Sequence, residues 1–334
     1  MATPIKVAIN GFGRIGRSLF RLLQENSAIE VVAINDISDP QTLSHLLKYD
    51  SIHGIFQHEV TYNDSNIIVN GKSIQFISFK NPSHCPWKEL NIDVVVDATG
   101  KFKSYSKAES HISAGAKKVI ISAPPEDNSI KTVVPGVNDE IITKEDKILS
   151  NASCTTNNAA PMIQIINNLC GIEQAYITTV HSYTTDQSLH DQPHRDLRRA
   201  RAAGQSIIPT TTGAAKALTK VFPELTSSLG GCGIRVPVPN GSLTDITFNV
   251  LRETSISEIN QAFKIAANSN YKGILSYTED PIVSVDIVGN THSCVFDSGM
   301  TSVIGKMVKV IGWYDNEIGY SSRLIELIEK ITSF

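Results

Sequence analysis

The sequence predicts an α/β protein with two domains: first a mostly parallel sheet covered by helices, then an α+β domain with a mixed or antiparallel sheet. Its 334 residues are more than one ordinary hydrophobic core requires. Up to about residue 150, short Val/Ile-rich runs alternate with helix-like stretches, the pattern of a parallel sheet. After that point, apolar and polar residues alternate as in antiparallel strands with one covered face.

In the first half we expect four buried strands and an amphipathic helix. The strands are predicted at 5–10, 30–35, 93–97 and 118–122, and the helix at 14–25. Each run ends in small or polar residues. The carboxyl ends of strands are where open α/β sheets bind their ligands, so we expect a ligand site at that edge.

The second half also contains strand and helix patterns, but in a different order from those of the first half. We expect strands at 175–180, 233–238, 243–251, 283–287 and 307–313. We expect helices at 155–169, 213–220, 257–268 and 319–331. No internal repeat and no Pro/Ser-rich linker separates the two halves.

Composition excludes several classes of function. With 41% apolar and 19% charged residues, the chain is typical of soluble globular proteins. A net charge of -3 gives no reason to expect nucleic acid or a membrane as a partner. The chain has no signal-peptide pattern at its start and no apolar run long enough to span a bilayer, so we expect a cytoplasmic protein.

The five cysteines are scattered and form no C-x-x-C pair. This argues against a disulfide framework and against a structural zinc site, and we predict no metal. All except Cys154 are expected to be small buried apolar residues.

Gly11-Phe-Gly13-Arg-Ile-Gly16 lies between the first predicted strand and the first predicted helix. In that context the pattern indicates a Rossmann-type dinucleotide site. Gly11 would permit a tight turn, Gly13 the approach of a pyrophosphate, and Gly16 close packing of helix on strand. The phosphates would bind at the N-terminus of the helix.

Asp36 stands 20 residues beyond Gly16, at the end of the second predicted strand. Its carboxylate would accept hydrogen bonds from the adenosine ribose and repel a 2′-phosphate, so the predicted cofactor is NAD. The alternative is a tight strand–helix turn with an unrelated capping Asp.

Cys154 precedes an apolar-periodic stretch and therefore falls at a predicted helix N-terminus, where free N–H groups and the helix dipole stabilise a thiolate. Its Ser, Thr and Asn neighbours suit a polar site better than a core. His181 follows the strand predicted at 175–180. It could serve as general base for Cys154, although a partly exposed structural histidine is the simpler alternative and spacing alone does not bring the two together.

These residues belong to longer motifs that resemble the glyceraldehyde-3-phosphate dehydrogenases. The motifs are Gly-Phe-Gly-Arg-Ile-Gly (11–16), His-Leu-Leu-Lys-Tyr-Asp-Ser (45–51), Ser-Asn-Ala-Ser-Cys-Thr-Thr-Asn (150–157), Ile-Pro-Thr-Thr-Thr-Gly-Ala-Ala-Lys (208–216) and Trp-Tyr-Asp-Asn-Glu-Ile-Gly-Tyr-Ser (313–321). The similarity covers the whole chain in order. The run 196–203 resembles the bacterial and plastid branch.

The resemblance implies a phosphorylating, NAD-dependent enzyme. Cys154 would attack the aldehyde of glyceraldehyde 3-phosphate, His181 would take up the proton, and inorganic phosphate would cleave the resulting thioester to give 1,3-bisphosphoglycerate. It also implies an oxyanion site at the Cys154 N–H and His181. Many relatives have a second cysteine where this chain has Asn158.

The resemblance further implies which residues bind ligands. Two anion sites would be formed by Ser153, Thr155, Thr184, Arg199, Thr212, Gly213 and Arg235. The cofactor would contact Gly11, Gly13, Arg14, Ile15, Gly16, Asp36, Lys80, Ser122 and Asn316.

By resemblance we expect an NAD-binding domain at 1–152, a catalytic domain at 153–318 and a last helix, 319–331, packed back on the first domain. We also expect a homotetramer. The nearest alternative is erythrose-4-phosphate dehydrogenase, a sibling that releases the acid by hydrolysis. An alternative of another class is an NAD-carrying binding or scaffold protein.

Overall fold

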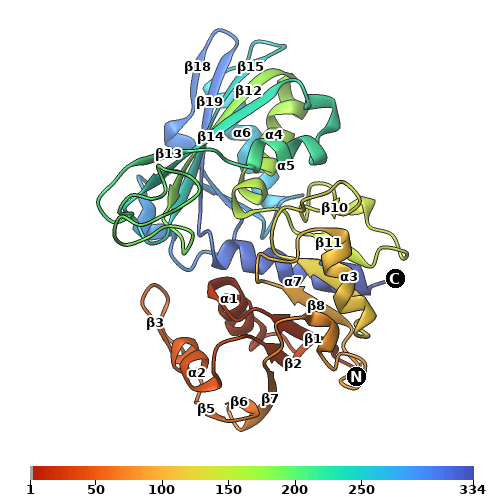
Figure 1. Ribbon diagram of the computed structural model, residues 1–334. Helices are drawn as coiled ribbons and strands as arrows, with labels where there is room; N and C mark the ends of the chain where they lie inside the picture. Colours follow the sequence, from red (N-terminus) through yellow and green to blue (C-terminus); the bar gives the residue numbers. More distant parts are fainter. Residues whose placement is uncertain (1–2) are drawn as a thin grey trace. The chain divides into compact units, whose positions relative to one another are not determined.

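The computed structural model describes residues 3–334, and the chain divides into two compact units. Unit 1 contains the residues up to Val133, together with Asp139–Ala152 and Ser321–Phe334. Unit 2 contains Val134–Asn138 and Ser153–Tyr320. Each unit has its own sheet (Figure 1).

Unit 1 contains a nine-stranded sheet in the order β10-β11-β9-β8-β1-β2-β7-β6-β5. From β10 to β7 all neighbours are parallel, and the antiparallel β6 and β5 extend one edge. The strands are β1 (Ile5–Asn10), β2 (Ile29–Asn35), β5 (Val60–Asn63), β6 (Asn66–Val69), β7 (Lys72–Ile77), β8 (Val94–Asp97), β9 (Lys118–Ile121), β10 (Lys131–Thr132) and β11 (Ile148–Ser150).

The remaining elements of unit 1 are connections between these strands. They are α1 (Arg14–Leu23), α2 (Pro40–Lys48), the ribbon of β3 (Tyr49–Asp50) and β4 (Gly54–Ile55), η1 (Pro82–His84), α3 (Tyr105–Ser113) and η2 (Asp139–Ile141). The predicted parallel sheet is thus confirmed, whereas β5, β6 and β7 were not predicted. Their short segments are half exposed and interrupted by Asn and Gly, so they carry little apolar periodicity.

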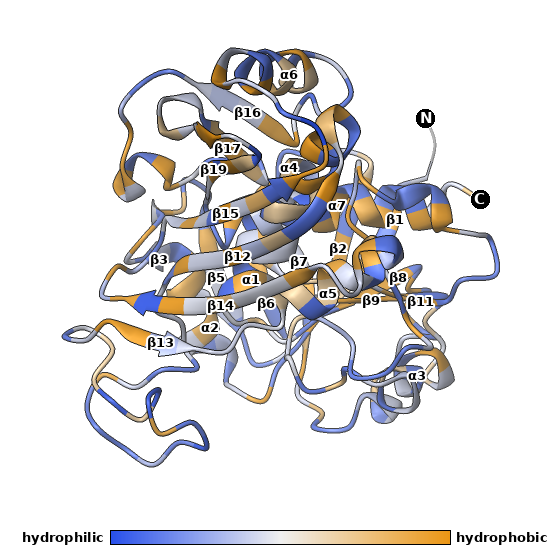
Figure 2. Cartoon of the chain, turned by 90° about the horizontal axis from the view of Figure 1, so that it is seen from above, coloured by the Kyte–Doolittle hydropathy of each residue, from blue (hydrophilic) through white to orange (hydrophobic). Residues whose placement is uncertain are grey.

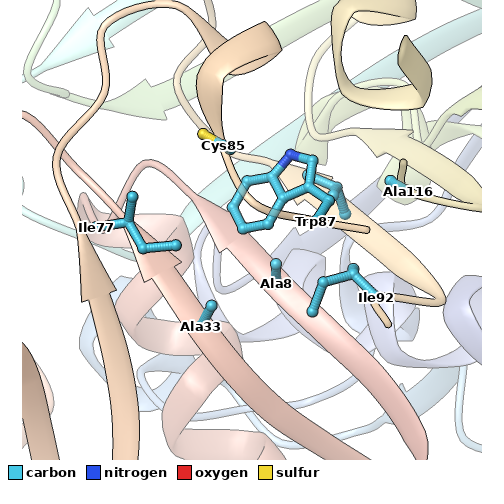
Figure 3. Packing of buried hydrophobic residues seen from close by; sticks show 8 residues of the cluster. Ala8, Ala33, Ile77, Cys85, Trp87, Ile92 and Ala116 are labelled. Atoms are coloured by element: carbon cyan, nitrogen blue, oxygen red, sulfur yellow. The ribbon is translucent and has the colours of Figure 1, made fainter. Parts of the chain in front are cut away.

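Trp87 is the centre of one apolar cluster of unit 1 and is fully buried. Figure 3 shows its indole beside Ala8 and Ala33, whose positions are paired in register on β1 and β2. Two alanines side by side leave room for a large ring, which explains why small residues occupy the middle of these strands. The indole Nε1–H donates to Nδ1 of the buried His111 over 3.1 Å.

Unit 2 contains a mixed sheet in the order β13-β14-β12-β15-β19-β17-β16, and β18 also pairs with β19. Only the β12–β14 and β16–β17 pairs are parallel. The strands are β12 (Ile172–Ser182), β13 (Ile208–Thr210), β14 (Leu229–Val236), β15 (Ser242–Val250), β16 (Leu275–Thr278), β17 (Cys294–Asp297), β18 (Ser302–Ile304) and β19 (Met307–Tyr314).

Helices of unit 2 pack on this sheet through apolar faces. They are α4 (Cys154–Cys170), α5 (Ala214–Val221) and α6 (Ile256–Asn268), with the short turns η3 (Pro223–Leu225), η4 (Ser284–Ile287) and η5 (Ser298–Met300). Figure 2 shows hydrophobic and hydrophilic residues alternating along α6. Its buried Phe263 stacks on Phe296 of β17 with ring centroids 3.8 Å apart.

The last helix, α7 (Ile318–Thr332), begins in unit 2 and continues into unit 1. None of the helices found between Thr3 and Phe334 combines the length and apolar character that crossing a membrane requires. Within the same residues, no group of three or more His, Cys, Asp and Glu side chains is placed to hold a metal ion.

Two predictions about unit 2 were wrong. The strand predicted at 283–287 is the turn η4, because the Asp286 side chain accepts the Val283 N–H over 2.8 Å and closes the backbone. Cys232 was expected to be buried but is only half-buried. It lies on β14, where its thiol is 3.8 Å from the Thr178 hydroxyl.

Candidate active site

The glycine-rich segment of unit 1 forms the turn between β1 and α1. Gly11 has a φ of 91°, a left-handed conformation that L side chains rarely adopt. A Cβ on Gly16 would lie 2.3 Å from the carbonyl oxygen of Gly11, inside contact distance. Both positions therefore require glycine for reasons of backbone geometry.

The N-terminus of α1 is open to an anion. The cap residue, Gly13, provides no side-chain hydrogen bond, and a Cβ placed on it would have no neighbour within 4 Å. The first N–H groups of a helix lack intrahelical acceptors and lie at its positive end. The Arg14 side chain turns instead to Asp50, with N–O distances of 2.5 and 3.1 Å. The turn therefore leaves open space above Gly13, next to the first residues of α1.

Asp36 directly follows β2 and connects that strand to the glycine turn. Its Oδ2 accepts the Phe12 N–H over 2.7 Å, and its Oδ1 accepts the Ser38 N–H over 2.9 Å. These bonds fix the position of the carboxylate, which still has lone pairs for ribose hydroxyls.

The remaining predicted cofactor residues of unit 1 lie at the same edge of the sheet. Ser122 directly follows β9, and its N–H donates to the carbonyl of Asp97 over 2.9 Å. Lys80 is exposed and lies three residues beyond the end of β7. Sequence reasoning missed the layer beneath them, where the last residues of β1, β2 and β8 are in register and form a buried hydrogen-bonded chain. These residues are Asn10, Asn35 and Asp97.

In unit 2 the structure brings Cys154 and His181 together. Cys154 is the first residue of α4, and Ser153 caps this helix by accepting the Thr156 N–H over 3.2 Å. His181 is the tenth residue of β12. The Cys154 Sγ is 3.4 Å from Nε2 of His181, within the reach of a hydrogen bond to sulfur.

The hydrogen bonds of His181 determine which ring nitrogen faces the thiol as an acceptor. Nδ1 lies 2.7 Å from the carbonyl oxygen of Ser182, which can only accept, and 2.9 Å from Nη1 of Arg235, which can only donate. Since the same Arg235 nitrogen can donate to the Ser182 carbonyl instead, we assign the proton to Nδ1. Nε2 then has a free lone pair directed at Cys154. Arg235 donates to the same carbonyl over 2.9 Å. Since this acceptor is shared, the guanidinium and the ring are held side by side.

Burial dominates the electrostatics of this pair. It raises the pKa of the Cys154 thiol, outweighing the opposite effects of Arg235 and of hydrogen bonds from Thr155. Burial, with the charges of Arg235 and Arg199, lowers the pKa of His181 to about 3. Burial therefore opposes a charge on either group, while Arg235 and the hydrogen bonds at the start of α4 favour the thiolate form of Cys154.

Two arginines place positive charge around the pair. Arg235 lies on β14 and is in register with His181 on β12. Arg199 donates to the Thr210 hydroxyl over 2.9 Å, to the Thr211 carbonyl over 3.2 Å and to the Asp186 carboxylate. Its charge also acts on His181 and Arg235.

The other residues predicted to bind phosphate differ in their exposure and in the hydrogen bonds that they already make. Thr212 and Gly213 stand at the start of α5, where the Thr212 hydroxyl accepts the Ala214 N–H over 3.2 Å. The Thr184 N–H donates to Gln187 Oε1 over 3.4 Å, and Thr184 is half exposed. The buried Thr155 instead uses its hydroxyl on Tyr314, 2.9 Å away.

Tyr314 and Asn158 are structural parts of the site that sequence reasoning did not assign. The Tyr314 hydroxyl also lies 2.9 Å from that of Thr179, and its ring meets the His181 ring edge-on. Tyr314 therefore links β19, β12 and the first turn of α4. The fully buried Asn158 donates to the carbonyls of Ser293 and Trp313, both over 3.2 Å. Their only sequence signal is membership of motifs that surround the nucleophile.

Unit 1 thus has a glycine-rich turn of the dinucleotide-binding type, and unit 2 has a Cys–His pair with arginines beside it. These two features are typical of dinucleotide-dependent oxidoreductases that use a cysteine. The family model for the NAD binding domain of glyceraldehyde 3-phosphate dehydrogenase matches residues 5–105, and that for the C-terminal domain of the same enzyme matches residues 153–316.

Individual relatives agree over nearly the full length. The chain is 54% identical to glyceraldehyde-3-phosphate dehydrogenase 2 of Streptomyces avermitilis over 97% of both chains. It is 52% identical to glyceraldehyde-3-phosphate dehydrogenase of Geobacillus stearothermophilus over 98% of both chains. The chain belongs to the glyceraldehyde-3-phosphate dehydrogenase family. It is an oxidoreductase with NAD as cofactor.

Proposed function

We propose that this enzyme forms a thioester on Cys154 while oxidising glyceraldehyde 3-phosphate, and that inorganic phosphate releases the product as 1,3-bisphosphoglycerate. The observation that carries this proposal is the 3.4 Å approach of the Cys154 Sγ to Nε2 of His181. A thiol with a raised pKa is a poor nucleophile on its own. The adjacent lone pair supplies the base that such a thiol requires.

His181 acts first as a base and then holds the proton near the reacting carbon. Nε2 accepts the thiol proton as sulfur attacks the aldehyde carbon and returns it to the new oxyanion, which becomes the hemithioacetal hydroxyl. The same nitrogen then takes up this hydroxyl proton when the thioester carbonyl forms. NAD, when bound, accepts the hydride that leaves that carbon. Attack of phosphate on the thioester then forms the acyl phosphate, and the sulfur leaves and is reprotonated from His181.

The arginines support binding of two phosphate groups. Arg235 and Arg199 carry the positive charge, and guanidinium groups recognise phosphate through paired hydrogen bonds. We assign Thr184 to the site of Arg235. Neutral donors of the second site are assigned to Ser153, Thr155, Thr212 and Gly213. Three of the five N–H donors of Arg199 have acceptors within the chain, which leaves two that phosphate could use.

We assign NAD binding in unit 1 to the glycine turn and the strand ends around it. The residues are Gly11, Gly13, Arg14, Ile15, Gly16, Asp36, Lys80 and Ser122. Asn316 of unit 2 is assigned to the nicotinamide carboxamide. In this assignment, residues 1–152 are the cofactor domain with helix 319–331 packed on it, and residues 153–318 are the catalytic domain.

We infer a cytoplasmic homotetramer. The free state of the five cysteines suits a reducing compartment. Several large apolar side chains of the unit 2 sheet are exposed, which suits burial against another subunit. They are Tyr176, Ile304 and Met307, exposed to 53%, 68% and 43%. Light scattering after size exclusion should give the mass of four chains, and a monomer would contradict this inference.

A coupled assay of NADH formation tests the proposed reaction. With glyceraldehyde 3-phosphate and NAD, we expect continuous turnover only when inorganic phosphate is present. Without phosphate, turnover should stop after about one equivalent of NADH per site, because the thioester accumulates. Rapid phosphate-independent acid formation from erythrose 4-phosphate would favour the sibling activity and overturn the proposal.

A further inference from the structure

Ser182 and Ser242 are fully buried serines that meet beside the Cys–His pair in unit 2. Ser182 directly follows His181 at the end of β12, and Ser242 is the first residue of β15. The Ser182 N–H donates to the Ser242 hydroxyl oxygen over 3.1 Å. The predicted catalytic and binding residues did not include either serine. Burial of hydroxyl groups is costly unless each is hydrogen bonded, so their other partners are informative.

Both hydroxyls converge on Asn316. The Ser182 Oγ donates to the Asn316 Oδ1 over 2.8 Å, and the Ser242 Oγ donates to the same oxygen over 3.1 Å. The Asn316 backbone N–H donates to Asn240 over 3.3 Å, which fixes the main chain as well. The amide oxygen of Asn316 therefore has two donors.

This arrangement favours one of the two ways in which the amide can face. Ser242 already accepts the Ser182 N–H, so its own proton needs an acceptor. With Oδ1 of Asn316 turned toward the serines, both hydroxyl protons are satisfied. With the amide reversed, the nitrogen would donate to both hydroxyls. The Ser242 proton could then reach only the Ser182 Oγ, 3.4 Å away, and the Ser182 proton would have no other acceptor among the contacts found in residues 3–334.

The consequence is an amide nitrogen held ready to donate. Asn316 is only 6% exposed, and among the described contacts its Nδ2 has no partner. A side chain that is free to rotate would lose entropy on binding a ligand, whereas a fixed one does not. The carbonyl oxygen of Ser182 also accepts hydrogen bonds from the side chains of His181 and Arg235. The base and the Asn316 amide are thus positioned from neighbouring atoms of one residue.

We propose that Ser182 and Ser242 are positioning residues for the nicotinamide, because their hydroxyls fix the Asn316 amide so that its nitrogen can donate to the carboxamide oxygen of the cofactor. This inference rests on the proposed assignment of Asn316 to the carboxamide. The two serines do not touch the cofactor in this account. They act through Asn316, which decides how the nicotinamide ring is held.

The test compares binding of NAD with binding of ADP-ribose, which lacks the nicotinamide. For Ser182→Ala we expect NAD affinity, measured by calorimetry, to fall about fivefold, as loss of one hydrogen bond implies. For Ser182→Ala combined with Ser242→Ala we expect about tenfold or more. ADP-ribose affinity should stay within twofold of the parent enzyme. The KM for NAD should rise, while the KM for glyceraldehyde 3-phosphate should stay unchanged.

Two controls separate positioning from damage to the fold. Ser298→Ala removes another buried serine hydroxyl of unit 2, one that donates to the Thr278 carbonyl over 2.7 Å, and should leave both affinities unchanged. The rate at which iodoacetamide alkylates Cys154 should also match the parent in all variants. The reason is that His181 contacts the backbone carbonyl of Ser182, which the substitutions do not remove.

Unchanged NAD affinity in the double variant would overturn the inference, and so would equal losses for NAD and ADP-ribose. The single Ser182→Ala variant keeps the test decisive if the double variant does not fold. Failure of the parent enzyme to oxidise glyceraldehyde 3-phosphate would instead refute the proposed function, because the difference between NAD and ADP-ribose can be measured without turnover.

Discussion

The helices α1 and α4 start in similar ways but serve different chemistry. Each is separated from the preceding strand by three residues, Gly-Phe-Gly before α1 and Asn-Ala-Ser before α4. Each of these turns contains a residue with positive φ, 91° at Gly11 and 55° at Ala152. The start of α1 has no side-chain cap, whereas Ser153 caps α4.

This difference decides what each helix start can bind. The uncapped start of α1 leaves backbone donors and open space above Gly13 for a phosphate. The capped start of α4 instead holds a thiol at its first position, where burial raises the thiol pKa despite the dipole. Burial at the start of α4 thus opposes the stabilisation of a thiolate, and in the proposed reaction His181 supplies the base.

The largest effect is expected for Cys154→Ser. Without the thiol no thioester can form, and activity in the coupled NADH assay should fall at least about 10⁴-fold, as it does when other covalent nucleophiles are removed. NAD binding by unit 1 should persist. Cys232→Ser, which changes a half-buried thiol on β14, is the matched control and should keep parent activity.

His181→Asn should lower kcat by about 10²- to 10⁴-fold, the range for loss of a general base. The pH dependence of alkylation tests the direction in which the pKa of Cys154 is shifted. Because the pKa of the Cys154 thiol is raised, its alkylation by iodoacetamide in the parent should keep rising with pH above neutrality. A plateau between pH 5 and 8 would mean a low-pKa thiolate and would remove the contrast between α1 and α4.

Two glycine variants at the start of α1 distinguish the effect of close backbone packing from the effect of open space for a ligand. Gly16→Ala places a Cβ 2.3 Å from the Gly11 carbonyl oxygen and should cost about 1–3 kcal/mol of stability. Gly13→Ala meets no neighbour within 4 Å and should change stability by less than about 0.5 kcal/mol.

For both variants we expect weaker NAD binding in titration calorimetry. In Gly13→Ala the cause would be loss of room for the pyrophosphate alone. If Gly13→Ala bound NAD as tightly as the parent, the open space above Gly13 would not be the phosphate site.

Asp50→Asn should have the smallest effect, confined to pH dependence. Burial would raise the pKa of Asp50, but hydrogen bonds from Arg14 and from the His53 and Ile52 N–H groups outweigh it and lower the pKa to about 2. Because solvent screens part of this interaction, the ion pair should stabilise the fold by no more than about 1 kcal/mol above pH 4, and the contribution should be lost as pH falls toward 2.

Urea unfolding at pH 6 and at pH 3 measures that contribution. The parent should lose more stability than Asp50→Asn between the two values. Equal losses would show that the Arg14–Asp50 pair does not stabilise the residue that starts α1.

Much of the fold could be predicted because its strands and helices carry strong periodicity. The strands at 5–10 and 307–313 and the helices at 155–169 and 257–268 match elements of the structure closely. The run at 283–287 was misassigned because Val, Val and Ile favour a strand, while a single Asp side chain closes a turn. Local hydrogen bonding of that kind leaves little trace in a hydrophobic pattern.

The site was predictable in its residues but less so in its physical state. The motifs singled out Cys154 and His181, and the structure places them in contact. Sequence could not show that burial would raise the pKa of a thiol at the start of a helix. Nor could it show that Ser182 and Ser242 meet, since they stand 60 residues apart and form their hydrogen bonds only when β12 and β15 lie side by side.

The most direct test is mass spectrometry of the enzyme quenched after mixing with glyceraldehyde 3-phosphate and NAD, without phosphate. We predict an acyl adduct on the peptide that contains Cys154, which disappears when phosphate is added before quenching. NADH formed without such an adduct, or an adduct on another residue, would contradict thioester formation at Cys154.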